Sequence, residues 1–416
     1  MQGTSRRCII VEPFLTGFAG HSFTVCRSLK SSLEKQGLEV LILANRGASP
    51  EVLEALGALP VFCSDFIGGD TEFPAFIPAA FKKLWLAYRH GTADLKKGFP
   101  PERLRPGDII FDYTMTTNWV LPFWQWTRQS PHRDSFRIVW QFFFPLAEAG
   151  AGFWPKLLFS RFYRRLFSGL AGGIKAGRIL LCSDTEHRAA EYSRATGLDF
   201  AVLPMATESD SPVSPPAGSS KIRLSSLGPA RIAKGIELIS DLTIKLQDLL
   251  KSGRIELVIQ ANPQPEGDLR VIAAIEKLRK ANLPNLELIN DPLSPSKYQT
   301  ALSGTGIMLL PYDPAIYGMA RTSGVFAEAM AAGIPVVVPR FTWTAQQCER
   351  YNTGAVFTYG DASDFETAVR GLIENYREYK ERSLAAAKSW NRDHGAEALA
   401  GIITGSKRVK TNRAEP

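Results

Sequence analysis

Short apolar runs alternate along the chain with helix-length segments in which apolar residues recur every three or four positions. In the first half these runs lie at Cys8–Val11, Glu39–Ala44, Asp108–Phe111, Phe136–Phe142, Arg178–Cys182 and Phe200–Leu203. The pattern restarts at Lys221–Leu227, Ile255–Gln260, Leu286–Asn290, Gly306–Pro311, Ile334–Val338 and Ala355–Phe357. Strands that alternate with helices predict parallel sheets covered by helices, the α/β class. The restart predicts two Rossmann-like doubly wound domains of similar size.

The two halves meet at a segment that is rich in Ser and Pro. This segment, ATESDSPVSPPAGSS at 206–220, has Val213 as its only large apolar residue, so we predict a linker there. An N-terminal domain is expected over 1–205 and a C-terminal domain over 221–385. We expect 386–405 to form a C-terminal helix that packs back toward the N-terminal domain. The apolar-poor stretch 406–416 is predicted to be a mobile tail.

Composition narrows the class of protein. The 416 residues are 45% hydrophobic and 22% charged, which excludes global disorder and suits two packed cores. The five cysteines are scattered and the chain has no apolar run long enough for a membrane helix, so we expect reduced thiols in a cytoplasmic protein. The net charge of +8 is uneven, because residues 1–205 hold 24 basic and 18 acidic side chains, a surplus of 6. Such a surplus suits an anionic partner or simply aids solubility.

The segment Gly306–Pro339 carries the strongest indication of a binding site. A buried strand leads through a Pro-Tyr-Asp-Pro loop to Thr322, Ser323 and Gly324, which open a helix containing Glu328. Free N–H groups and the helix dipole at such an end suit a diphosphate, and a carboxylate one turn later could hold ribose hydroxyls. The competing interpretation is that Thr322 is an ordinary N-cap and Glu328 a solvated helix residue.

Two other strand-to-helix loops hold candidate residues. In Leu224–Glu237 a strand ends at Gly228, and Arg231 and Lys234 precede a helix, where cations can neutralise pyrophosphate; the alternative is two surface cations near a glycine turn. In Thr16–Arg27, Gly17 and Gly20 allow close backbone approach, and His21 either lines a site or packs at a helix start. The glycine spacing does not match a dinucleotide fingerprint, and no Asp-x-Asp pair is present for a divalent ion.

In their order along the chain these features resemble a GT-B glycosyltransferase, most closely the retaining family 4 group. The matching features are the glycine-rich first loop with His21, Ser183 after a strand, Leu203-Pro204, Gly228 with Lys234-Gly235, the strand Leu286–Asn290 and the helix with Glu328. The resemblance implies two Rossmann-like domains that face each other across a cleft, the N-terminal domain binding the acceptor and the C-terminal domain the nucleotide sugar. It implies no metal and no cofactor.

Residue roles follow from the same resemblance. Lys234 and Arg231 would contact the donor diphosphate as catalytic cations, Glu328 would hold the ribose, and Gly17, Gly20 and His21 would form the acceptor-side loop. The remaining donor-binding positions would be Gly228, Tyr312, Arg321, Thr322, Ser323 and Gly324.

The chain also departs from the family pattern. Ala320 replaces the first acid of the family's Glu-x7-Glu element, Pro229 replaces an arginine, and the histidine expected after the fourth strand is absent from IVWQFFFP.

The basic surplus gathers in a stretch without acids between Glu148 and Asp184. Within FWPKLLFSRFYRRLFSGL, three arginines and Ser168 fall on one helical face and the apolar residues on the other. A second basic and aromatic cluster is formed by Lys82, Lys83, Trp85, Tyr88, Arg89, Lys96 and Lys97. Such a helix suits an anionic membrane surface, while the alternative packs its apolar face on the N-terminal sheet. Nothing beside this charge indicates nucleic-acid binding.

These observations favour a retaining glycosyltransferase on the cytoplasmic membrane face that moves a sugar from a nucleotide sugar to a lipid-linked or surface-polysaccharide acceptor. One alternative is a GT-B nucleotide-sugar epimerase, which would need paired carboxylates and histidines in the cleft. A second is a catalytically degenerate GT-B protein that binds nucleotide sugar or a partner without turnover, as Ala320 and Pro229 would allow.

Overall fold

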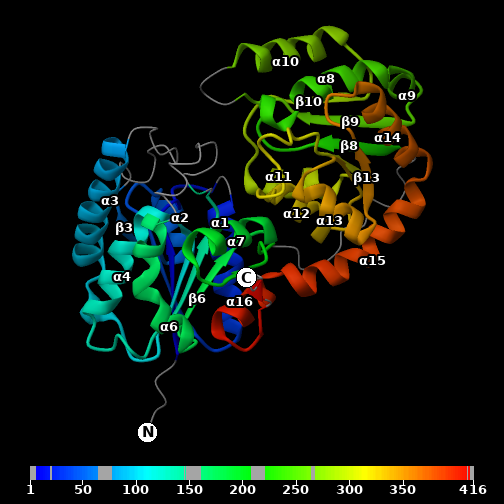
Figure 1. Cartoon of the computed structure of the whole chain (residues 1–416). Coiled ribbons are helices and arrows are strands. Elements are labelled where there is room, and N and C mark those ends of the chain that lie inside the picture. Colours follow the sequence, from blue (N-terminus) through cyan, green and yellow to red (C-terminus); the bar gives the residue numbers. More distant parts are fainter. Residues whose placement is uncertain are drawn as a thin grey trace. The chain divides into compact units, whose positions relative to one another are not determined.

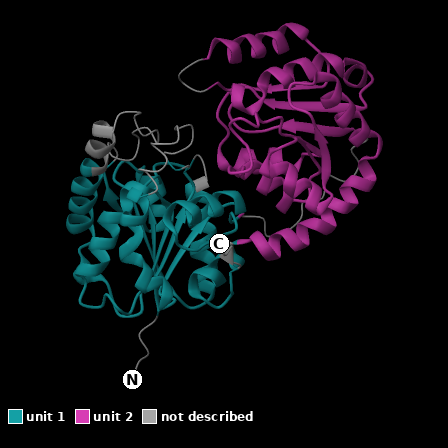
Figure 2. Cartoon of the chain, viewed as in Figure 1, with its two compact units in different colours: residues 1–206, 396–416 teal, residues 207–395 magenta. Residues whose placement is uncertain are grey.

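The computed structural model describes residues 6–18, 21–63, 77–144, 146, 161–207, 221–263, 268–409 and 411–412, and for 21, 77–84 and 411–412 it gives the backbone alone. The chain divides into unit 1, residues 1–206 and 396–416, and unit 2, residues 207–395 (Figure 2). Each unit is one sheet flanked by helices (Figure 1). The predicted α/β class with two doubly wound halves is therefore confirmed. The linker predicted over 206–220 lies almost wholly outside the described residues.

The sheet of unit 1 has eight strands in the order β14-β7-β6-β5-β4-β1-β2-β3, all parallel except β14. Their bounds are β1 (Arg7–Glu12), β2 (Glu39–Asn45), β3 (Leu59–Phe62), β4 (Ile109–Met115), β5 (Arg137–Phe142), β6 (Ile179–Ser183), β7 (Phe200–Val202) and β14 (Thr411–Asn412). The helices are α1 (His21–Lys35), α2 (Pro50–Leu56), α3 (Ile77–Gly98), α4 (Val120–Gln129), α6 (Ala171–Lys175), α7 (Glu186–Thr196) and α16 (Ala396–Thr404).

Both faces of this sheet are buried, because alternate residues of each strand enter different cores. Ile9 and Val11 of β1 pack with α3, α4 and α7, whereas Cys8 and Ile10 pack with α1, α2 and α16. Because both faces are buried, the strands consist of nearly continuous runs of apolar residues. The strand β3 was not predicted, because it has four residues and includes Pro60.

The sheet of unit 2 has six parallel strands in the order β10-β9-β8-β11-β12-β13. Their bounds are β8 (Ile222–Ser226), β9 (Ile255–Gln260), β10 (Leu286–Ile289), β11 (Ile307–Leu309), β12 (Val336–Pro339) and β13 (Gly354–Phe357). The helices are α8 (Ile236–Lys245), α9 (Gln247–Lys251), α10 (Leu269–Ala281), α11 (Pro295–Ser303), α12 (Gly324–Ala331), α13 (Trp343–Tyr351), α14 (Ala362–Glu374) and α15 (Tyr376–His394).

Both sheets reverse their strand order at one point, between β1 and β4 in unit 1 and between β8 and β11 in unit 2. At such a switch point the loops beyond the two strands leave in opposite directions and open a crevice at the carboxyl edge. The fold therefore places the loops after β1 and β4, and those after β8 and β11, where ligands bind in doubly wound proteins.

The structure corrects two expectations for the C-terminal segment. The single helix predicted over 386–405 is interrupted at Gly395, where the backbone is extended, so the segment contains the end of α15 and all of α16. A Cβ at position 395 would lie 2.4 Å from the Asn391 carbonyl oxygen. The second helix, α16, packs against α1 in unit 1, with Leu399 and Ile403 buried. The predicted mobile tail contains β14, which pairs with β7 through backbone hydrogen bonds that need no apolar side chains.

Candidate functional site

The loop after β8 is shaped by a glycine that no other residue could replace without strain. Gly228 has a φ of 95°, in the left-handed region, and its N–H donates to Gln260 Oε1 over 2.7 Å. Gln260 Nε2 in turn donates to Asn262 Oδ1 over 2.8 Å. The end of β9 therefore fixes the turn by which the chain leaves β8.

Lys234 occupies the space that this glycine leaves. A Cβ on Gly228 would lie 2.5 Å from Lys234 Nζ, so the ammonium group sits where a side chain at 228 would project. Lys234 ends a short 3-10 turn, Ile232–Lys234, and the next residue, Gly235, has a φ of 75°. A Cβ on Gly235 would lie 2.1 Å from the Pro311 carbonyl oxygen. The loops after β8 and β11 thus meet closely, with Lys234 between them.

The loop after β11 contributes two tyrosine rings to the site. The Lys234 Nζ lies 5.8 Å from the centroid of the Tyr312 ring, and the Tyr312 and Tyr317 centroids are 4.6 Å apart. The Arg321 Cζ lies 4.5 Å from the Tyr317 centroid. A small hollow here is lined by Gly228, Arg231, Lys234, Gln260 and Tyr312 among others. The structure thus brings together the predicted residues Gly228, Arg231, Lys234, Tyr312 and Arg321.

The cations of this site form no ion pair with any acid in the described part of the chain. Burial first, and then the charges of Arg231 and Arg321, lower the pKa of Lys234 to about 8, although Glu328 acts in the opposite sense. Among the described residues, Arg231, Lys234 and Arg321 take part in no ion pair. A partly desolvated cation without an ion-pair partner is unfavourable, and a bound anion would relieve this cost. The site is therefore built for an anion.

The helix α12 begins beside these residues. Ser323 is its N-cap, with Oγ accepting from the Phe326 N–H over 3.2 Å, so the cap is Ser323 and not Thr322. Gly324, the first helical residue, is buried. The cap leaves other N–H groups of the first turn available, and they add partial positive charge to that of the cations.

The carboxylate of Glu328 is held by a residue that the sequence did not indicate. The Tyr298 hydroxyl of α11 donates to Glu328 Oε2. Burial and the Glu328 charge raise the pKa of Tyr298, so its hydroxyl stays protonated and keeps donating. Glu328 is therefore a half-buried, hydrogen-bonded residue and not a freely solvated one. Tyr298 and Glu328 are 30 positions apart, and no local pattern links them.

The switch point of unit 1 holds acids instead of cations. Glu12, the last residue of β1, is fully buried, and its Oε1 accepts from the Thr114 hydroxyl of β4 over 3.0 Å and the Phe14 N–H over 3.1 Å. Burial raises the pKa of Glu12 to about 7, against the lowering effect of these hydrogen bonds. Burial and the Glu12 charge also raise the pKa of Asp112 in β4. The sequence did not single out either acid.

The predicted acceptor-side loop is described only in part. Gly20 and the side chain of His21 lie outside the described residues, and α1 begins at His21. A Cβ on Gly17 would meet no atom within 4 Å, so packing inside the chain does not require a glycine there. A role for this loop stays a prediction.

The basic stretch of unit 1 is described from residue 161 onward. Arg161, Arg164 and Arg165 are exposed, whereas the apolar residues Tyr163, Leu166, Phe167 and Leu170 are buried in the core with the sheet. In this part of the stretch the apolar face packs on the sheet of unit 1, as the alternative interpretation predicted, so it is not available to a membrane. Of the second basic cluster, Lys82 and Lys83 have no described side chains, and Trp85 is exposed. No helix in the described part of the chain is long and apolar enough to cross a membrane.

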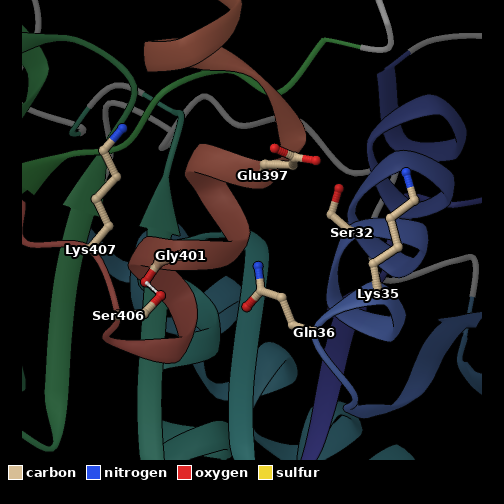
Figure 3. Close-up of a pocket in the computed structure, with 7 residues that line it drawn as sticks. All are labelled: Ser32, Lys35, Gln36, Glu397, Gly401, Ser406 and Lys407. Carbon is tan, nitrogen blue, oxygen red and sulfur yellow. Dashed lines mark hydrogen bonds between the residues drawn. The ribbon is translucent and has the colours of Figure 1, made fainter.

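A separate hollow of unit 1 is lined by seven residues: Ser32 and Lys35 of α1, Gln36 just after that helix, and Glu397, Gly401, Ser406 and Lys407 (Figure 3). It lies at the C-terminal end of α1, whereas the carboxyl edge of the sheet is at the N-terminal end of that helix. Its lysines and Glu397 are exposed to solvent. The hollow therefore belongs to neither switch point.

Solved structures share this fold, whereas neither a family model nor a curated protein matches the sequence. The lipopolysaccharide glycosyltransferase WaaG is 16% identical, with a TM-score of 0.58 over 96% of this chain and 100% of that one. HepE of Anabaena, in complex with UDP and glucose, is 10% identical, with a TM-score of 0.59 over 96% and 99%. A candidate UDP-N-acetylglucosamine 2-epimerase of Listeria monocytogenes is 16% identical, with a TM-score of 0.58 over 97% and 96%. The chain has the GT-B fold of these proteins.

Proposed function

We propose that the chain is a retaining glycosyltransferase that moves a sugar from a nucleotide sugar to a lipid-linked or surface-polysaccharide acceptor. The observation that carries the proposal is the partly desolvated Lys234 at the switch point of unit 2, which has no ion-pair partner among the described residues and lies beside Arg231 and Gly228. These groups suit a diphosphate, and Glu328 suits the ribose of the same nucleotide. WaaG and HepE, which share the fold, are respectively a glycosyltransferase and a protein that binds UDP and glucose.

In the proposed reaction the bond from the sugar to the diphosphate breaks, and the acceptor hydroxyl forms a new bond on the same face of the sugar. The hydroxyl proton passes to the departing diphosphate. Arg231, Lys234 and the first turn of α12 stabilise the charge that develops on that leaving group. The protein therefore contributes positioning and electrostatic stabilisation, and it forms no covalent bond to the sugar, because a nucleoside diphosphate is a stable leaving group.

The proposal is tested by incubating the chain with UDP-, GDP- and dTDP-sugars and measuring nucleoside diphosphate release, with and without lipid-linked acceptors. Release that increases with acceptor supports a transferase. Recovery of a sugar with inverted configuration, without any acceptor, identifies the epimerase instead, an alternative favoured by the shared fold of the Listeria protein. Binding without turnover identifies the degenerate alternative.

We further propose that unit 1 contacts an anionic membrane surface from the cytoplasmic side through the exposed arginines Arg161, Arg164 and Arg165. Because the neighbouring apolar side chains are buried, this contact is electrostatic and involves no insertion. Flotation with vesicles of neutral and of anionic lipid, at low and high salt, tests it. Binding that is equal for both vesicle types, or that persists at high salt, contradicts it.

A further inference from the structure

Two side chains that line the hollow of unit 2 carry a hydrogen-bond donor without an acceptor. The Tyr312 hydroxyl and the Arg231 Nε are buried, and neither has a hydrogen-bond partner among the described residues. The amide of Gln260 does not supply one, because its Oε1 accepts from the Gly228 N–H and its Nε2 donates to Asn262. A buried donor that lacks an acceptor is unfavourable. The hollow therefore suits a ligand that brings acceptor atoms.

The structure holds the Tyr312 side chain in a defined position. Tyr312 is 3% exposed, and its ring packs on that of Tyr317 with the centroids 4.6 Å apart. The Lys234 Nζ lies 5.8 Å from the centroid of the Tyr312 ring. The backbone is held as well, because the Tyr312 N–H donates to the Leu310 carbonyl oxygen over 2.8 Å. A hydroxyl on a ring held in this way loses little conformational freedom when a ligand binds.

The groups that act on this hydroxyl belong to the anion site. Burial first, and then Tyr317 and Glu328, raise the pKa of Tyr312 above its ordinary value. The Ser323 side chain and the charge of Arg231 act in the opposite sense. Ser323 is the N-cap of α12. The Tyr312 hydroxyl therefore lies near both Arg231 and the start of α12, and it stays protonated there.

The chemistry of a phosphate matches this donor. The oxygens of an ionised phosphate only accept hydrogen bonds, and a hydroxyl that donates to them forms a charge-assisted bond without adding charge to the site. Arg231 and Lys234 line the same hollow, whereas Glu328, the residue suited to the ribose, is not among the described residues that line it. The hollow therefore belongs to the phosphate that is further from the ribose.

We propose that the Tyr312 hydroxyl donates a hydrogen bond to the terminal phosphate of the nucleoside diphosphate, the phosphate to which the sugar is attached. The proposal rests on the donor site described under the proposed function and assigns a further substrate-contacting residue to it. As the sugar leaves, negative charge grows on this phosphate and the hydrogen bond strengthens. Tyr312 then stabilises the leaving group together with Lys234, through a donor that carries no charge.

The test compares the intact chain with Tyr312→Phe, which keeps the ring that packs on Tyr317 and contacts Lys234. Calorimetry measures the binding of inorganic pyrophosphate, UDP and UMP, with GDP and GMP as a second pair. Tyr312→Phe should weaken the binding of pyrophosphate and of the nucleoside diphosphates about 10-fold, equivalent to about 1.4 kcal/mol. The binding of UMP and GMP, which lack the terminal phosphate, should change less than about twofold.

Two further measurements separate a ligand contact from a structural role. The melting temperature of Tyr312→Phe should stay equal or rise, because the hydroxyl that is removed has no partner in the described part of the chain. The loss of affinity should be equally large at pH 7 and pH 9, because the hydroxyl stays protonated while Lys234, with a pKa of about 8, loses its charge. A loss that disappears at pH 9 assigns the effect to Lys234 and overturns the proposal. A lower melting temperature with weaker binding of every ligand overturns it as well.

Tyr379→Phe provides a matched control. Tyr379 is a half-buried tyrosine of α15 that packs against the core of unit 2, outside the hollow. It should leave all affinities unchanged. Equal affinity of the intact chain and Tyr312→Phe for pyrophosphate and the nucleoside diphosphates overturns this inference and leaves the proposed function standing. If the intact chain binds none of these ligands, the proposed function and this inference fall together.

Discussion

The two switch points occupy equivalent positions in similar sheets and carry opposite charge. In unit 1 the ends of β1 and β4 are joined by Glu12, a buried acid bonded to Thr114. In unit 2 the loops after β8 and β11 enclose Lys234, with Arg231 and Arg321 near it. Glu12 accepts hydrogen bonds only at Oε1, and its Oε2 is buried without a hydrogen-bond partner. The cations of unit 2 have no ion-pair partner among the described residues. The same fold position thus holds a buried carboxyl group in one unit and a group of cations in the other.

The net charge of each half of the chain does not indicate the charge at its switch point. Residues 1–205 hold most of the basic surplus, yet the buried groups at the switch point of unit 1 are acidic. Beyond residue 205 the chain is nearly balanced, and its switch point is cationic. Arginines such as Arg164 and Arg165 are exposed on the surface, so they add to the total without entering a site.

The largest expected effect comes from removing the central cation of unit 2. Lys234→Ala should reduce kcat of sugar transfer by about 10²–10³-fold, the loss typical when one group that stabilises developing charge is removed. The melting temperature should stay equal or rise, because an unpaired, desolvated charge is removed. The exposed Lys277, paired with Asp241, provides the control: Lys277→Ala should retain full turnover. Unchanged kcat in Lys234→Ala would remove this residue from its role.

The acid of unit 1 should act on stability instead. The pKa of Glu12 is raised from 4.5 to about 7, so the stability linked to its protonated form is present below pH 4.5 and lost as the pH rises through 7. Glu12→Gln keeps an oxygen for Thr114 and Phe14 and removes the charge. It should increase the free energy of unfolding by about 3 kcal/mol at pH 8 and by little at pH 4.5. A gain of equal size at both values would show that the charge is not responsible.

The titration of Lys234 gives a smaller and more specific effect. Its pKa of about 8 means that the ammonium form, which attracts diphosphate, declines above this pH. The affinity for UDP should fall about tenfold from pH 7 to pH 9, as measured by calorimetry. Lys234→Arg stays charged over this range and should bind with a nearly constant affinity. A fall of the same size in that variant would assign the titration to another group.

The smallest expected effect concerns the support of Glu328. Tyr298→Phe removes the donor to Oε2 and should weaken binding of UDP about fivefold, the value of about 1 kcal/mol for one hydrogen bond. Binding of inorganic pyrophosphate, which has no ribose, should not change. A parallel loss for both ligands would mean that Tyr298 supports the whole site and not its ribose side.

The sequence predicted the fold well because strand and helix periods are local properties. Gly228, Lys234 and the start of α12 were also predictable, because strand-end loops of parallel sheets meet at one edge. The contact of Tyr298 with Glu328 was not, since it depends on how two helices pack. Glu12 was missed because a lone acid at a strand end gives no sign of its burial. The apolar face near Arg164 was ambiguous, because a core and a membrane select the same side chains.

The break at Gly395 determines the order in which the chain can fold during synthesis. Unit 2 is one continuous segment, so all its strands are available once residue 395 has been made. Unit 1 is discontinuous: its α16 closes over α1, and Arg137 donates to the carbonyls of Ile402 and Ile403. The half that is translated first therefore completes its core last. During the interval its apolar surface along α1 stays uncovered, which makes the nascent unit 1 the part of the chain most in need of a chaperone.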